Sequence, residues 1–108
     1  MIFLRLIDQL TPWHLRVLAL LDEPVRWMER YGVQNPGWGM GGPSTVLEHC
    51  LPDLRGNRET YDQIVRDLQA EGLLGQGQFL HVTMTGGGMV ASRTTERGKQ
   101  FIKFITVN

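Results

Sequence analysis

Apolar residues recur at helical spacing through most of the chain. The spacing of those between Phe3 and Leu10 predicts a short N-terminal helix within residues 1–10. Thr11 and Pro12 predict the start of a second helix, because threonine caps free backbone amides and proline fits the first helical position. The apolar residues after Pro12 are so dense that this second helix is expected to be the central helix of the core.

A third helix is predicted over residues 24–31, and Gly32 is expected to end it as a C-cap. The segment that follows, residues 32–42, contains five glycines. Glycine gives the backbone so much conformational freedom that this segment is expected to be a loop without regular structure. Trp38 and Met40 lie within it.

Two further helices are predicted in the middle of the chain. Ser44 or Thr45 is expected to cap the first of them, which ends before Pro52 because the residue before a proline avoids the α conformation. After a turn, Asn57 is expected to cap a longer helix that Gly72 closes. Leu73 then follows in the position that contacts the last helical turn in a Schellman ending.

The periodicity changes in the last third of the chain. Residues 78–84 and 89–94 are enriched in β-branched and aromatic side chains, and they flank the sequence Thr85-Gly86-Gly87-Gly88. A glycine-rich turn between two such segments predicts a β-hairpin. Thr94 or Thr95 is then expected to cap a final amphipathic helix.

The order of these elements resembles a winged helix-turn-helix domain of the kind found in bacterial regulators. The resemblance rests on the helix pair within residues 44–72, on the Leu68–Leu74 segment with its Gly-Leu-Leu ending, and on the helix start at residues 94–102. It implies an α+β, mostly helical fold in which a C-terminal β-hairpin wing precedes the last helix. The alternative is another small α+β domain built from the same elements.

On this interpretation residues 1–108 form a single domain with four recognisable parts. These are an extra N-terminal helix over 1–10, the helix-turn-helix over 44–72, the wing over 73–94 and the last helix over 95–106.

The resemblance also implies binding to double-stranded DNA. In such domains the second helix of the pair lies in the major groove, and the wing contacts phosphate or the minor groove. Four residues would then read bases: Asn57, Arg58, Gln63 and Arg66. Arg55 and Arg93 would contact phosphates.

Charge favours a different partner. Eleven basic and eleven acidic groups leave no net charge, although residues 1–54 carry −2 and residues 55–108 carry +2. The exposed face of the expected recognition helix holds more acidic than basic groups, which is poor for phosphate contacts. Asp62 and Asp67 would weaken the DNA interpretation further if they lay between the arginines.

The alternative is a protein-interaction or oligomerisation module. In this module either the wing tip near Met84 and Met89 or the loop with Trp38 and Met40 would meet a partner. DNA binding is slightly favoured over this alternative. Under either function a homodimer through the N-terminal helix is expected, with Phe3 and Ile7 at the contact. Trp13 and Trp27 are expected in the core or under the N-terminal helix, since large aromatic side chains dominate small cores.

The remaining chemistry is sparse. One cysteine, Cys50, cannot form an internal disulfide, which favours a reducing, cytoplasmic compartment. The apolar runs are too short to cross a membrane. No histidine or cysteine pair has the spacing of a structural zinc site, and no nucleophile has an activating base in a recognisable pattern. The sequence therefore predicts a non-catalytic protein without metal or cofactor.

Overall fold

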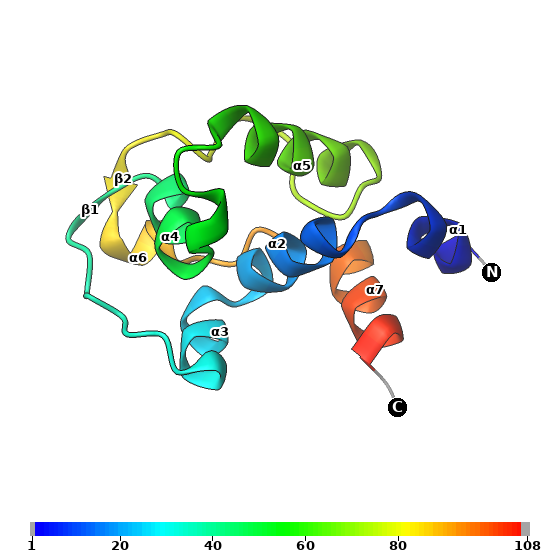
Figure 1. The fold of residues 1–108 in the computed structure, drawn as a ribbon, viewed down its shortest axis with the longest axis horizontal. Helices are drawn as coiled ribbons and strands as arrows, with labels where there is room; N and C mark the ends of the chain where they lie inside the picture. Colours follow the sequence, from blue (N-terminus) through cyan, green and yellow to red (C-terminus); the bar gives the residue numbers. More distant parts are fainter. Residues whose placement is uncertain (1, 107–108) are drawn as a thin grey trace.

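The structure, a computed structural model that describes residues 2–106, is mostly helical and has one small antiparallel sheet (Figure 1). In chain order the elements are α1 (Ile2–Gln9), α2 (Pro12–Asp22), α3 (Pro24–Tyr31), β1 (Met40–Gly41), α4 (Pro43–Cys50), the 3₁₀ turn η1 (Pro52–Leu54), α5 (Arg58–Ala70), β2 (Met84–Thr85), α6 (Gly86–Met89) and α7 (Glu96–Thr106). The expected α+β, mostly helical class is confirmed. Residues 1, 107 and 108, which the single-domain prediction included, lie outside the described residues.

Helix α2 is the central helix of the core, as its apolar density predicts. It packs against α3, α5 and α7, and its Val17, Leu18 and Leu20 are fully buried. Thr11 caps its start, since the Thr11 hydroxyl oxygen accepts a hydrogen bond from the His14 backbone N–H. The His14 ring completes the capping box, because its Nδ1 accepts from the Thr11 backbone N–H at 3.2 Å.

The helix ends also follow the sequence. Gly72 adopts a φ of +76°, and the Leu73 N–H donates to the Leu68 carbonyl at 3.0 Å. This is the predicted Schellman ending of α5. Thr95 caps α7, because its hydroxyl oxygen accepts from the Gly98 N–H at 3.0 Å.

The predicted hairpin over residues 78–94 is wrong. Residues 86–89 form the short helix α6 instead of a reversing turn, and the Thr85 hydroxyl oxygen caps it by accepting from the Gly88 N–H at 3.2 Å. Strand β2 pairs with β1, not with residues 89–94. An isolated antiparallel β-bridge between Leu74 and Thr94 joins the two ends of the predicted wing.

Three smaller predictions are also corrected. Residues 40–41 of the expected loop form β1, because the loop lies beside residues 84–86 and the Gly86 N–H donates to the Gly39 carbonyl at 2.9 Å. Helix α4 begins at Pro43 with Gly42 at its N-cap, so neither Ser44 nor Thr45 caps it. Asn57 occupies the N-cap of α5 without a capping bond, since its amide donates to the Asp53 carbonyl.

The arrangement leaves distinct surfaces at different places. Figure 1 shows α1 and α7 at one end of the molecule and the small sheet at the opposite end, with α5 lying across the top of the view. The face between α2 and α3 lies below α5 in the same view. Within residues 2–106, no helix is both long enough and apolar enough to cross a lipid bilayer.

Candidate functional site

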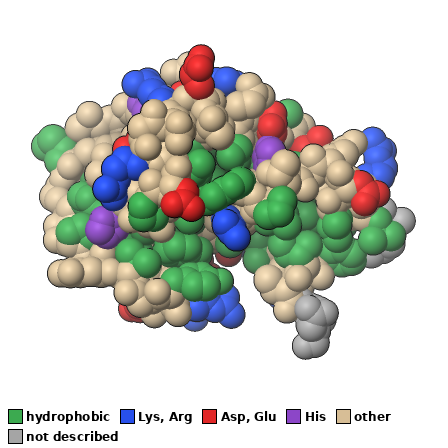
Figure 2. Space-filling model, in the orientation of Figure 1, with side chains coloured by type: hydrophobic (Ala, Val, Ile, Leu, Met, Phe, Trp, Pro, Cys, Tyr) green, Lys and Arg blue, Asp and Glu red, His purple; other side chains and the backbone are tan. Residues whose placement is uncertain are grey.

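The exposed face of α5, the expected recognition helix, carries acidic groups between its arginines. Arg58 Nε lies 3.6 Å from Asp62 Oδ2, and Asp62 stands one helical turn from both Arg58 and Arg66. Arg66 donates to the Gln63 side-chain oxygen at 3.0 Å. Figure 2 shows both signs of charge mixed along the top of the molecule, where α5 lies. A phosphate approaching these arginines would therefore also meet a carboxylate.

Asp62 and Asp67, the two acidic residues that disfavour DNA binding, are each hydrogen-bonded to other side chains. Asp62 Oδ1 lies 2.7 Å from His81 Nε2, and Asp67 Oδ2 lies 2.8 Å from His14 Nε2. The Gln63 amide donates to the other Asp67 oxygen at 2.7 Å. Because His14 Nδ1 accepts from a backbone N–H, its Nε2 carries the proton and donates to Asp67. These carboxylates are fixed in place.

Arg93 follows α6, outside the turn and helix that carry the other five predicted DNA contacts, and it turns inward. Its Nη2 donates to the Gly88 carbonyl at 2.7 Å, and its guanidinium lies 5.1 Å from the centre of the Phe79 ring. Its Nε is buried without an acceptor among the described residues. Arg93 therefore holds the segment that replaces the predicted hairpin and is not poised on a phosphate. Arg55 and Asn57 lie exposed in the turn before α5.

The four predicted partner contacts do not form one surface. Phe3 packs inward between Phe101 and Phe104, with ring centres 5.4 and 5.5 Å away. Ile7, on the same helix, is 43% exposed. Trp38 folds back onto the His49 ring, whereas Met40 in β1 is 73% exposed.

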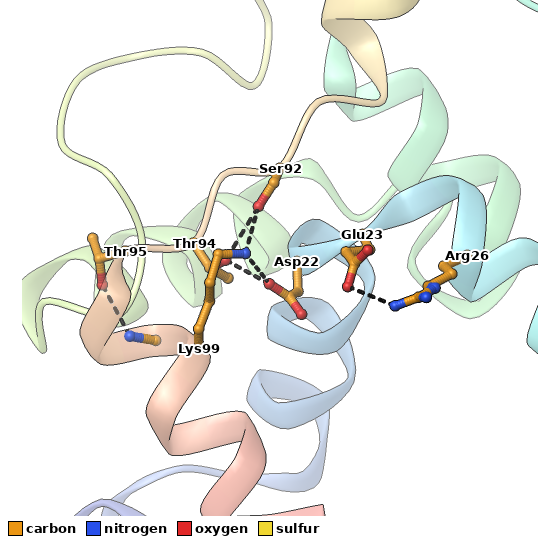
Figure 3. Close-up of polar contacts among 8 residues, drawn as sticks. Asp22, Glu23, Arg26, Ser92, Thr94, Thr95 and Lys99 are labelled. Atoms are coloured by element: carbon orange, nitrogen blue, oxygen red, sulfur yellow. Dashed lines mark hydrogen bonds and ion pairs between the residues drawn. The ribbon is translucent and has the colours of Figure 1, made fainter.

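A polar cluster joins the end of α2 to the start of α7 (Figure 3). Asp22 Oδ1 accepts from the Thr94 hydroxyl at 2.6 Å and from Lys99 Nζ at 2.8 Å. Lys99 Nζ also lies 3.2 Å from Ser92 Oγ, so a serine stands beside an amine. A nucleophilic serine needs a base that can take its proton. Here the lysine donates to a carboxylate, and the cluster serves to tie two helices together.

An apolar hollow of about 460 Å³ opens between α2, α3 and η1. We call it the aromatic groove and define it by the residues that line it, which are Trp13, Leu15, Arg16, Ala19, Trp27, Tyr31, Leu51, Pro52 and Asp53. The Trp27 and Tyr31 rings are in contact, with centres 4.8 Å apart and planes inclined at 44°, and the Arg16 guanidinium lies 4.7 Å from the Trp13 ring centre. Tyr31 is 61% exposed.

A second hollow, of about 590 Å³, lies on the other side of the Trp27–Tyr31 pair. It shares Ala19, Trp27 and Tyr31 with the aromatic groove, but its remaining lining is mostly charged. The Trp27–Tyr31 pair is therefore a ridge between an apolar hollow and a charged one. Figure 2 shows hydrophobic side chains gathered over α2 and α3 on this face of the molecule.

Sequence reasoning missed the aromatic groove. Trp13 and Trp27, which the sequence predicts in the core or under the N-terminal helix, are each only half-buried and line the groove. Two spacings indicate it in retrospect: Trp27 and Tyr31 are four residues apart, and Trp13 and Arg16 are three apart. Residues at those separations meet on one helix face. What brings the two pairs together is the packing of α3 against α2, which has no local signal.

The remaining reactive groups are isolated from one another or buried. Within the described residues, no three histidine, cysteine or acidic side chains gather as a metal ion would require. Cys50 is buried, and burial raises the pKa of its thiol to about 11, so the reactive thiolate is disfavoured. No protein-family model, curated protein or solved structure matches this chain.

The hydrogen bond from His14, with that from Gln63, predicts how stability depends on pH. These bonds hold the pKa of Asp67 below its ordinary value of 3.8. A carboxyl group whose pKa is lowered by folding stabilises the native state above its unfolded pKa, and loses that contribution as the pH falls through the folded pKa. We therefore expect the free energy of unfolding to fall as the pH drops below about 4.

Urea unfolding at a series of acidic pH values measures this dependence. Asp67→Asn should flatten the acid limb of the profile. The matched control is Asp53→Asn, because the Asp53 carboxylate has no hydrogen bond or ion pair within residues 2–106. Equal profiles for wild type and Asp67→Asn would contradict the prediction.

Proposed function

We propose that this chain is a non-catalytic binding domain that recognises another protein through the aromatic groove. The observation that carries the proposal is the composition of the groove. Trp13, Trp27, Tyr31 and Arg16 all line it, and tryptophan, tyrosine and arginine are the residue types that supply most binding energy at protein interfaces. Leu15, Ala19 and Leu51 complete an apolar surface between them.

The groove also has the character of a preformed site. Its side chains hold one another through the tilted contact of Trp27 with Tyr31 and the contact of Arg16 with Trp13. Pre-arranged side chains lose little conformational entropy when a partner binds. A partner would therefore gain binding free energy by burying the exposed Tyr31 ring, without the cost of first ordering the site.

Binding of double-stranded DNA is the second candidate. The succession α4, η1 and α5, followed by the Leu74–Thr94 bridge and α7, supports the winged helix-turn-helix interpretation. Arg55, Asn57 and Arg58 lie exposed around the start of α5, the end that meets bases in such domains. The mixed charge of α5 and the inward position of Arg93 rank this candidate below the first.

One experiment with two arms tests the proposal. In the first, a random peptide library is panned against the whole chain, and enriched peptides are titrated while tryptophan fluorescence is recorded. Tyr31→Ala should weaken their binding at least tenfold. Met40→Ala is the matched control, because Met40 is also exposed and lies in the sheet, outside the groove.

In the second arm, random duplex DNA is titrated at low salt. We expect no binding tighter than about 10⁻⁴ M, the weak end of non-specific binding by a DNA reader. Peptides that bind Tyr31→Ala as tightly as wild type would overturn the proposal. Salt-sensitive DNA binding that Arg55→Ala and Arg58→Ala together abolish would favour the second candidate.

A further inference from the structure

We propose that the aromatic groove takes a proline-rich peptide in the polyproline II conformation. This inference rests on the proposed function and names the chemistry of the partner segment. It follows from the polar groups that the groove presents among its apolar side chains.

Those polar groups are hydrogen-bond donors. The indole N–H groups of Trp13 and Trp27 donate to no acceptor within residues 2–106, and neither is buried away from solvent. The exposed Tyr31 hydroxyl has no partner among the same residues, and Arg16 forms no ion pair there. Asp53 is the one carboxylate in the lining. The side chains of the groove therefore offer apolar surface, four hydrogen-bond donor groups and one carboxylate acceptor.

A complementary ligand is apolar and rich in acceptors. A helical peptide does not meet this requirement, because its backbone carbonyls are already bonded within the helix. An ordinary extended peptide exposes carbonyls, but it also brings N–H groups that would need acceptors. A run of prolines has no backbone N–H and leaves every carbonyl free. Its backbone carbonyls can accept from the donors of the groove, and it brings no N–H groups that need acceptors.

The shape of the groove supports the same ligand. Proline rings pack flat against aromatic side chains, and domains that bind polyproline II segments use aromatic-lined grooves. The Trp27–Tyr31 ridge provides two adjoining aromatic rings, and Trp13 lines the same hollow. Because polyproline II is already formed in the free peptide, little ordering entropy opposes binding.

The test uses an eight-residue oligoproline peptide, which spans about 25 Å in the polyproline II conformation. It is titrated into the whole chain while the indole N–H signals are followed by NMR. The chain has three tryptophans. The signals of Trp13 and Trp27 should shift and saturate, whereas that of Trp38 should not, because Trp38 packs on His49 in another part of the molecule. A glycine-serine peptide of equal length should shift none.

Two variants separate the ring of Tyr31 from its hydroxyl. Tyr31→Ala should weaken oligoproline binding at least tenfold, and Tyr31→Phe should weaken it by a smaller factor because the ring remains. Met40→Ala should bind as wild type does. Equal affinities for wild type and Tyr31→Ala would overturn the inference, as would an oligoproline peptide that leaves the Trp13 and Trp27 signals unmoved.

Failure of this inference can be told from failure of the proposed function. If library peptides without proline shift the Trp13 and Trp27 signals while oligoproline does not, the groove binds protein but not a proline-rich segment. If no peptide of either kind shifts them, both the inference and the proposed function are wrong.

Discussion

Replacing Gly98 with alanine is expected to destabilise the fold by about 3 kcal/mol or more, because the added methyl group has no room. Gly98 is buried in α7, and a Cβ built there would lie 2.1 Å from the Leu73 carbonyl oxygen and 3.3 Å from the Thr94 Cβ. The first distance is far below van der Waals contact, so the backbone of one segment must move.

Neither segment can move freely. The Leu73 carbonyl accepts from the Thr95 N–H at 3.1 Å, and the Thr95 hydroxyl donates to the Gly72 carbonyl at 2.6 Å. Leu73 itself is fully buried. Moving α7 outward would instead break the contact of Lys99 with Asp22 shown in Figure 3. The strain therefore spreads to the whole packing of α7 on α2.

Urea unfolding followed by far-UV circular dichroism measures the loss. Gly87→Ala is the control, because a Cβ at Gly87 meets no atom within 4 Å. That variant should change the free energy of unfolding by less than about 1 kcal/mol. Should Gly98→Ala unfold at the wild-type urea concentration, the close approach of α7 to Leu73 is wrong.

The helices were predictable because their signals are local. The Thr11 cap, the Gly72 ending and the Thr95 cap each depend on residues within five positions of one another, and the structure has all three. Asn57 marks the start of α5 correctly, although its side chain bonds elsewhere. Such motifs form in the same way wherever the segment packs.

The sheet was not predictable, because its pairing is non-local. Met40 pairs with Thr85, 45 positions along the chain. Locally, Thr85 can cap a helical turn as readily as it can precede a β-turn, and the three glycines after it allow both. In the folded chain Gly86 lies so close to the Trp38 backbone that a Cβ there would collide with the Trp38 carbonyl oxygen, and this non-local contact has no signal near Gly86 in the sequence.

The candidate site shows the same limit. The expected DNA contacts were chosen by residue type, which cannot reveal that Arg93 turns onto Phe79 or that His81 fixes Asp62. Tyr31 and Trp13 belong to different helices, and only the packing of α3 against α2 makes them neighbours across one hollow. The sequence shows which residue types typical of an interface are present, but it does not show which of them lie together on one surface.

Phe101→Ala is expected to destabilise the protein by about 3 to 5 kcal/mol, the range for removing a large aromatic ring from a core. The Phe101 side chain is fully buried. It also contacts Phe3, whose ring centre lies 5.4 Å away. The substitution should therefore create a cavity beside α2 and loosen α1, which Phe3 anchors to α7. A stability of about 5–15 kcal/mol is typical of a domain, so the loss is a large fraction of it.

Phe104→Ala separates these two effects, because Phe104 contacts the same Phe3 ring but is only half-buried. Its loss of stability should be smaller than that of Phe101→Ala, while amide hydrogen exchange in α1 should accelerate in both variants. Equal losses would mean that Phe101 is not part of the central core. In the folded fraction of either variant, Tyr31 and Trp27 should still bind peptide, because the aromatic groove takes none of its lining residues from α1 or α7.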